Sequence, residues 1–241
     1  MDRQRLTILL VLALIFLGAT TFYFAQVAHD SKTRFRAGYP VPTNLLPQDL
    51  LTTDQKIPTG PPTPPDIRPT DPILSGNASS SVTVIMFGDF QSETSRQEAI
   101  AIDDAIKLVG GTRDIRVIWR DFPLTSEHSK AVMLATAARC AGAENKFKSM
   151  HDLIVSEGKD FDEAEILRFA RKIGLNEQNF AICMRDPAQT FHISKDAEDA
   201  IMHGIKGVPT LFIDGFPFVG FVDAQSLATI FRRDLTISTT P

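Results

Sequence analysis

Hydrophobic and polar positions follow patterns that predict one mixed α/β domain in the C-terminal two-thirds of the chain. Val82–Phe87 is a short apolar run rich in β-branched residues, which is typical of a buried strand. Ser95–Val109 has apolar residues at helical spacing and is followed by Gly110-Gly111, so it is predicted to be a helix. Ile115–Phe122 is again strand-like. A strand, a helix and a strand in this order predict a right-handed crossover between parallel strands.

Helical patterns dominate the middle of the domain, and a hairpin and a helix close it. Asp214-Gly215 indicates the hairpin, because this dipeptide favours the turn between two antiparallel strands. The elements together predict β-α-β, a helical insertion and then α-β-β-α, which is a thioredoxin fold with a helical subdomain between its halves. The predicted helices are Ser126–Ala143, Lys146–Ser156, Asp162–Ile173, Asn176–Arg185, Pro187–His203 and Ala224–Leu235, and the hairpin strands are Thr210–Ile213 and Phe216–Val219.

The first residues of the chain have a different pattern. Residues 1–5 form a short polar tail, predicted to be cytoplasmic, and Leu6–Phe24 is a mostly apolar run without a charge. This run is long enough to cross a bilayer as a helix and exceeds the apolar core of a signal peptide. Ala25 and Ala28 do not form a clean cleavage site, which favours an uncleaved signal anchor over a cleaved signal peptide. Basic residues lie on both sides of the run and do not decide its orientation.

Residues 25–70 are predicted to be a linker. Most of the chain's prolines fall between Pro40 and Pro72, and proline favours an extended spacer because it fixes φ and donates no backbone hydrogen bond. Residues 71–236 have the length of one compact domain with its own core. The net charge of −4, with acidic and basic residues interspersed, provides no basic surface for nucleic acid.

Four local patterns occur in order along residues 71–236. They are the strand and loop VTVIMFGDFQ, the segment WRDFPLTSEHS, the helix AARCAGAENKFKSMHDL and the loop GIKGVPTLFIDG. In this order and spacing they resemble the DsbA-like branch of the thioredoxin superfamily, whose members are thiol-disulfide oxidoreductases. The resemblance implies a helical insertion at about 125–186. It also implies a cis-proline at Pro209 and a groove at Val208 and Pro209 that binds extended polypeptide. A cis-proline also defines the turn into the following strand, and retention for this structural reason alone is the favoured interpretation.

The residues at the redox position depart from the family. The resemblance places the Cys-x-x-Cys motif at Ser92, Glu93, Thr94 and Ser95. A hydroxyl has a far higher pKa than a thiol and cannot form a mixed disulfide, so dithiol exchange is not expected at this site. Ser92 is also a preferred N-cap residue, an interpretation that involves no catalysis. No residue is therefore assigned a catalytic role.

The two cysteines, Cys140 and Cys183, lie outside this motif. Their wide separation does not fit a metal-binding pair, and no Cys/His cluster surrounds either residue, so no metal is expected. If the domain faces an oxidising compartment, the pair is predicted to form a structural disulfide. Two separate buried thiols are the alternative. The histidines are scattered and are interpreted as structural.

The favoured function is a single-pass protein of a bacterial cell membrane, with a DsbA-like domain on the extracytoplasmic side. It would bind extended polypeptide or an envelope protein without dithiol chemistry, and it would need no cofactor. One alternative is a glutathione-dependent transferase or isomerase, because related enzymes share this fold and use a serine near the first-cysteine position; here Ser92 or Ser95 would stabilise the thiolate. The other alternative is an active protein-disulfide oxidoreductase, which the family favours and the motif residues do not support.

Overall fold

The computed structural model describes residues 60–111, 114–158 and 160–238. The predicted membrane span, residues 6–24, and most of the predicted linker lie outside the described residues. Among the residues that are described, no helix is both long and apolar enough to cross a membrane.

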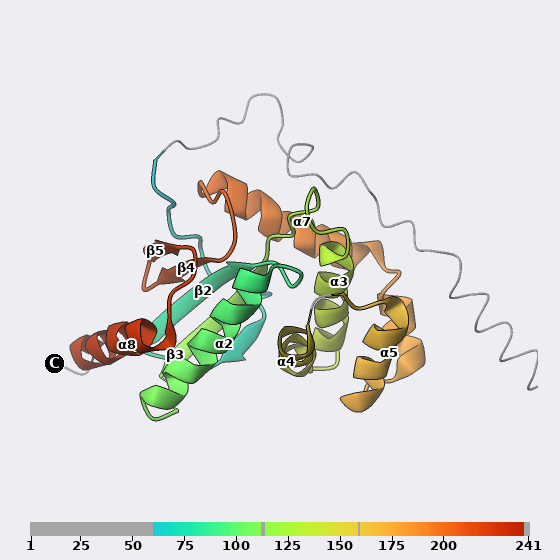
Figure 1. The fold of residues 1–241 in the computed structure, drawn as a ribbon, viewed down its shortest axis with the longest axis horizontal. Coiled ribbons are helices and arrows are strands. Elements are labelled where there is room, and N and C mark those ends of the chain that lie inside the picture. The colour runs from blue at the N-terminus through green and yellow to red at the C-terminus, as the bar shows by residue number, and fades with distance from the viewer. Residues whose placement is uncertain (1–59, 112–113, 159, 239–241) are drawn as a thin grey trace, which may run out of the picture. The chain divides into compact units, whose positions relative to one another are not determined.

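A five-stranded sheet and the helices around it make up the described domain (Figure 1). Their order is the predicted one, with one further strand, β1, before the first predicted strand. This is a mixed α/β thioredoxin fold in which α3 to α6 form a helical insertion between β3 and β4. The bounds are β1 Ile73–Ser75, β2 Val82–Gly88, α2 Glu93–Leu108, β3 Ile115–Asp121, α3 Ala131–Gly142, α4 Phe147–Glu157, α5 Glu163–Lys172, α6 Glu177–Cys183, α7 Pro187–Met202, β4 Thr210–Ile213, β5 Phe216–Val219 and α8 Ala224–Ser238.

The sheet has the strand order β1-β3-β2-β4-β5. β2 and β3 are parallel, with Val82 opposite Ile115, as predicted for two strands joined by a crossover helix. β4 is antiparallel to β2, β5 to β4, and β1 to β3. The β4–β5 turn consists of Asp214 and Gly215, both with positive φ, which is the conformation that a two-residue hairpin turn favours.

The central strand β2 is buried on both faces, and its alternate residues serve the two faces. Val84 and Met86 belong to the larger core, which also contains apolar residues of α2, α8 and the helical insertion. Ile85 and Phe87 belong to a smaller core, together with α7 and the loop that follows it. Burial on both sides explains why Val84–Phe87 is continuously apolar rather than alternating.

Two helices begin more than one residue away from the predicted start, and α4, α5 and α6 each begin one residue later than predicted. α2 begins at Glu93 rather than Ser95, because Ser92 is its N-cap and accepts a hydrogen bond from the Ser95 N–H. α3 begins at Ala131 rather than Ser126. The residues before Ala131 form turns that are bonded to the loop before α2, and these bonds take the place of helical ones.

Candidate functional site

The four residues at the predicted motif position form the start of α2. Ser92 is the N-cap: its backbone is extended, with φ −72° and ψ 122°, and its hydroxyl oxygen accepts a 3.3 Å hydrogen bond from the Ser95 N–H. The Ser92 hydroxyl also lies 3.1 Å from that of Thr94. The Ser92 side chain is therefore engaged in capping the helix.

Ser95 is buried beneath the first turn of α2. Its exposed fraction is 0%, and its hydroxyl oxygen accepts a 3.3 Å hydrogen bond from the backbone N–H of Asp89. Ser92 is only 7% exposed, whereas Glu93 and Thr94 are exposed. A molecule that approaches this helix start from solvent therefore meets a carboxylate and the Thr94 hydroxyl before it meets either serine.

The negative charge of Glu93 is balanced within α2. Its carboxylate forms an ion pair with Arg96 and accepts a 3.0 Å hydrogen bond from Gln97 Nε2. The Arg96 side chain is buried, and its Nη1 has no hydrogen-bond partner among the described residues. A carboxylate in the first turn of a helix is favourable, so Glu93 stabilises the start of α2.

A buried carboxylate holds the loop before α2 in place. Asp89 Oδ1 accepts a 2.8 Å hydrogen bond from the Gln91 N–H. Asp89 Oδ2 accepts one of 2.9 Å from the Leu124 N–H and lies 2.8 Å from His128 Nδ1. Gln91 Oε1 in turn accepts a 2.8 Å hydrogen bond from the Lys130 N–H. The loop before α2 and the β3–α3 connection form one bonded unit, which no spacing rule in the sequence indicates.

An aromatic stack lies beneath the same loop. Phe90 packs against Trp119 with ring centroids 4.5 Å apart, and the His151 ring lies 4.9 Å from that of Trp119. Trp119 Nε1 donates a 2.7 Å hydrogen bond to Asp121. Gly88 passes close to the stack, since a Cβ at this position would lie 2.5 Å from the Trp119 ring. The loop that carries the motif position is therefore fixed by packing as well as by hydrogen bonds.

The Val208–Pro209 peptide bond is cis. Phe87 of β2 pairs with Thr210 of β4, so Pro209 lies one residue beyond the last pair, at the end of the sheet where α2 begins. The Pro209 carbonyl accepts a 2.9 Å hydrogen bond from the N–H of Gly220, just after β5. Both residues predicted to bind peptide therefore lie at the end of the sheet that carries the serine motif.

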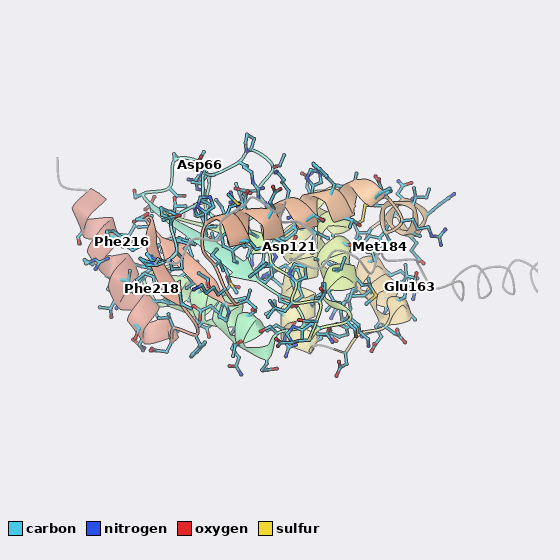
Figure 2. The ribbon with its side chains drawn as sticks, turned by 90° about the horizontal axis from the view of Figure 1, so that it is seen from above. Asp66, Asp121, Glu163, Met184, Phe216 and Phe218 are labelled. Atoms are coloured by element: carbon cyan, nitrogen blue, oxygen red, sulfur yellow. A yellow bond between two sulfur atoms is a disulfide. The ribbon has the colours of Figure 1, made fainter. Side chains whose placement is uncertain are left out.

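β5 is the edge strand beside this loop, and it exposes apolar side chains. Phe216 is 67% exposed, Val219 69% and Phe221 51%. Figure 2 shows Phe216 and Phe218 on this strand, at the opposite end of the domain from the helical insertion. Val219 pairs with Thr210, the residue after the cis-proline, so the apolar edge is continuous with the cis-proline loop. An edge strand of this kind is a surface for strand addition.

A buried carboxyl group lies further along α2. Glu98 is fully buried. Its Oε2 accepts a 2.7 Å hydrogen bond from the Val222 N–H, and its Oε1 has no partner among the described residues. Burial raises the pKa of Glu98 to about 7; the hydrogen bond from Val222 opposes this effect and the charge of Asp223 adds to it. Glu98 therefore ties α2 to the segment after β5 and changes protonation near neutral pH.

A family model for the DSBA-like thioredoxin domain matches residues 83–232. The chain belongs to this family. A thioredoxin-like oxidoreductase from Silicibacter pomeroyi is 24% identical, with a TM-score of 0.61 over 70% of this chain and 94% of that chain. The thiol-disulfide exchange protein α-DsbA2 from Wolbachia pipientis is 25% identical, with a TM-score of 0.59 over 70% of this chain and 88% of that chain.

The curated relatives of this DSBA-like chain are much longer proteins. The Na⁺/H⁺ antiporter NhaA 1 of Salinispora arenicola is 29% identical over 155 residues, which are 64% of this chain and 23% of the antiporter. The chain thus spans about a quarter of the length of the curated relatives it matches.

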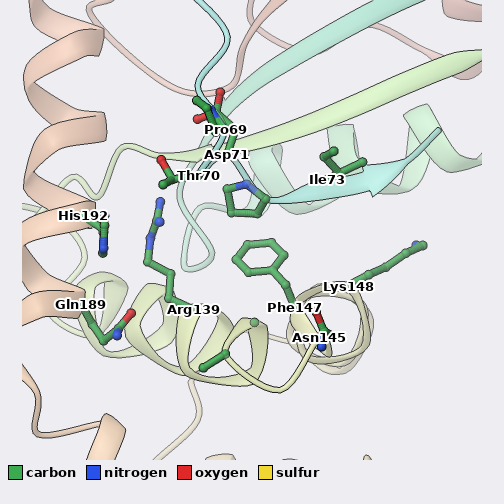
Figure 3. Close-up of a pocket in the computed structure, with 13 residues that line it drawn as sticks. Pro69, Thr70, Asp71, Ile73, Arg139, Asn145, Phe147, Lys148, Gln189 and His192 are labelled. Carbon is green, nitrogen blue, oxygen red and sulfur yellow. The ribbon is translucent and has the colours of Figure 1, made fainter. Parts of the chain in front are cut away.

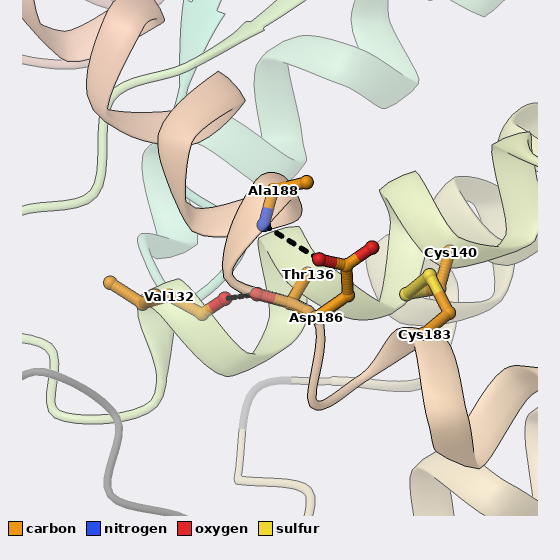
Figure 4. Close-up of a disulfide and its surroundings, with 6 residues drawn as sticks. All are labelled: Val132, Thr136, Cys140, Cys183, Asp186 and Ala188. Atoms are coloured by element: carbon orange, nitrogen blue, oxygen red, sulfur yellow. Dashed lines mark hydrogen bonds between the residues drawn. A yellow bond between two sulfur atoms is a disulfide. The ribbon is translucent and has the colours of Figure 1, made fainter.

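The cysteines of this DSBA-like chain lie in the helical insertion, away from the start of α2. Cys140 of α3 and Cys183 of α6 form a disulfide (Figure 4), and the chain has no other cysteine. Cys140 is 2% exposed. The bridge joins two helices of the insertion, and the two positions that the resemblance assigns to the redox cysteines are Ser92 and Ser95.

Metal-ligating side chains do not converge in the described part of the chain, where no group of three or more His, Cys, Asp or Glu residues is placed to hold a metal ion. The histidines near the motif have structural partners instead. His128 faces the buried Asp89, and His151 Nδ1 lies 3.0 Å from Asp152 Oδ1.

Proposed function

We propose that this DSBA-like chain is a membrane-anchored, extracytoplasmic protein that binds extended polypeptide without exchanging disulfides. The observation that carries the proposal is that an exposed apolar edge lies beside cis-Pro209 while serines occupy both predicted cysteine positions, 92 and 95. Ser95 is buried and Ser92 caps α2, so neither is placed to act as a nucleophile. The surface for an extended chain is kept, while the groups that would form a mixed disulfide are replaced.

Binding would use the free edge of β5 and the cis-proline loop. Among the described residues β5 is the last strand of the sheet, so one row of its backbone groups faces away from the other strands. Pro217 has no N–H to donate, so an extended segment would pair with this edge mainly at Val219, next to the cis-proline loop, while Phe216 and Val219 contact its apolar side chains. Such a surface selects for exposed apolar sequence and does not require a cysteine in the ligand.

Two features support the proposal that the chain is anchored in a membrane with its domain on the extracytoplasmic side. The uncharged run Leu6–Phe24 is long enough for a membrane anchor. The disulfide between Cys140 and Cys183 suits an oxidising compartment, where such bonds persist.

Photo-cross-linking tests the binding surface. A benzoylphenylalanine replaces Phe216, which is 67% exposed on β5, or Phe191, which is 65% exposed on α7. The full chain in detergent is irradiated with an unfolded polypeptide whose thiols have been alkylated. We expect cross-links from position 216 and few from position 191, the matched control. Equal cross-linking from both positions would contradict the proposed surface.

Two assays test the absence of disulfide exchange. We expect no insulin reduction by the full chain, and the same result for the Cys140→Ser/Cys183→Ser variant. Sustained turnover that disappears in the variant would assign redox chemistry to this pair and overturn the proposal. Calorimetry with glutathione tests the transferase alternative: heat of binding that Ser92→Ala abolishes would favour that alternative.

The curated relatives support a second candidate, a binding module that works beside a membrane transporter. In the Salinispora arenicola antiporter the matched segment is 23% of a longer chain that is named for sodium-proton exchange. A separate chain with the same domain can serve an equivalent transporter as a partner. Chemical cross-linking in native membranes, followed by mass spectrometry, tests this candidate. Recovery of an ion transporter would support it, and recovery of diverse secreted polypeptides would favour the first proposal.

A further inference from the structure

The last part of the predicted linker lies against the domain. We call Thr63–Asp71 the strap. At its start, the Thr63 N–H donates a 3.0 Å hydrogen bond to the His203 carbonyl, and the Thr63 hydroxyl lies 3.1 Å from His203 Nδ1. Pro65 is buried. The sequence predicts an extended spacer here, and in the structure the start of the strap is bonded to the end of α7.

Charged side chains hold the other end of the strap. Arg68 forms ion pairs with Asp196 and, at 3.2 Å, with Asp199 of α7. Asp71 accepts a 2.7 Å hydrogen bond from Arg120 of β3, and Arg120 also donates to the carbonyl of Asp66. The Arg120 side chain is 0% exposed and those of Asp71 and Asp196 are 2% exposed. Buried charges are tolerated only when they are paired, so the strap supplies counter-charges that the domain requires.

The cluster extends beyond the strap into the helical insertion. Arg139 of α3 donates a 2.6 Å hydrogen bond to Asp121 at the end of β3 and pairs with Asp196. The end of the strap also forms one wall of a pocket of about 600 Å³, with Arg139 opposite Thr70 (Figure 3). The strap, β3, α3 and α7 are therefore joined by one set of ion pairs.

The register of the sheet shows from which side the strap approaches. Pro64 lies beside the β4–β5 turn, since a Cβ on Gly215 would be 3.7 Å from Pro64 Cγ. That turn is bonded to the start of β2, where the Asp214 N–H donates to the Thr83 carbonyl. The candidate site lies at the other end of β2, after Gly88. The chain thus reaches the domain at the end of the sheet opposite the candidate site.

We propose that the buried ion pairs of the strap clamp this segment to the domain, so that the residues just before Thr63 are held at the end of the sheet that carries the β4–β5 turn, away from the cis-proline loop and the start of α2. The strap contacts α7, β3 and the β4–β5 turn, so the proposal does not depend on whether the candidate site binds polypeptide.

Spin-label distances test the proposal on the full chain. Nitroxides are attached at Gly60→Cys, where a side chain meets open space, and at Gln97→Cys on the exposed side of α2. Both natural cysteines are in the disulfide and do not react. We expect a single narrow distance distribution. We expect Arg68→Gln to broaden it, and Arg171→Gln, a matched change at a 56% exposed arginine, to leave it narrow.

Hydrogen exchange at the Thr63 amide gives a second measurement. We expect this amide to exchange at least tenfold more slowly than in an unstructured peptide, and to lose that protection in Arg68→Gln. The fluorescence of Trp119, the single tryptophan, reports whether the domain of each variant remains folded. A broad distance distribution or an unprotected Thr63 amide in the natural chain would overturn the proposal. An Arg68→Gln variant with an unchanged distance distribution and unchanged exchange at the Thr63 amide would also overturn the proposal, because the strap would then stay in place without the ion pairs of Arg68.

Discussion

The buried Glu98 makes the stability of the domain depend on pH. Its folded-state pKa of about 7 lies above the ordinary value of 4.5, because burial disfavours the carboxylate. A raised carboxyl pKa means that the folded state binds the proton more tightly than the unfolded chain does. The contribution of Glu98 is therefore most favourable below pH 4.5, and it is lost as the pH rises from 4.5 to about 7.

The size of this effect follows from the two pKa values. At 1.36 kcal/mol for each pKa unit, a rise from 4.5 to about 7 corresponds to about 3 kcal/mol of unfolding free energy. Glu98→Gln removes the titration and keeps an oxygen acceptor for the Val222 N–H. We expect the free energy of unfolding of this variant, relative to the natural chain, to increase by about 3 kcal/mol between pH 4.5 and pH 8.

Urea denaturation followed by Trp119 fluorescence measures this difference, with the disulfide kept intact so that unfolding is a single transition. Glu127→Gln is the matched control, because Glu127 is exposed and lies outside the core. We expect the free energy of unfolding of this control to equal that of the natural chain at every pH. If the difference between Glu98→Gln and the natural chain stays constant across this range, the argument from burial is wrong.

Changes at three places, two by substitution and one by reduction, test other parts of the structure, each by urea denaturation. Gly88→Ala places a methyl group against the Trp119 ring, and overpacking of this kind costs about 1–3 kcal/mol; no loss would contradict the close contact. Ser92→Ala removes the N-cap of α2, with an expected loss of about 1 kcal/mol, whereas Ser92→Asp should retain most of the stability. Reduction of the Cys140–Cys183 bridge should cost about 4 kcal/mol in the chain-entropy model, and an unchanged midpoint would contradict that model.

Hydrophobic patterns predict the fold well where the burial or backbone conformation of an element depends on the residues of that element alone. Val84–Phe87 is apolar on both faces because both faces are buried, so the sequence of this run predicts a buried strand. The Asp214-Gly215 turn is equally local, since its backbone needs positive φ at both residues. The crossover between β2 and β3 follows from the order of elements. Features that depend on local chemistry are therefore visible in the sequence.

The burial of charged residues cannot be predicted from such patterns. Arg120 and Glu98 have the composition of surface residues, yet both are fully buried. Their burial depends on partners such as Asp71 and Val222, which lie far from them in sequence, and no periodicity records such pairs. The same holds for Asp89 and His128, which fix the loop before the motif. In the sequence, a charged residue next to an apolar run predicts the end of a buried strand. Only the folded structure shows that such a residue is buried and paired with another side chain.

The hydrogen bond from Asp89 to Ser95 makes position 95 part of the core. A cysteine there would replace an oxygen acceptor by a larger and weaker sulfur acceptor at a position with no exposed surface. A single change to cysteine at this position disturbs packing and gives no dithiol pair, because Ser92 must change as well. A thiol motif at the start of α2 therefore needs two substitutions, one of them at a position that is part of the core.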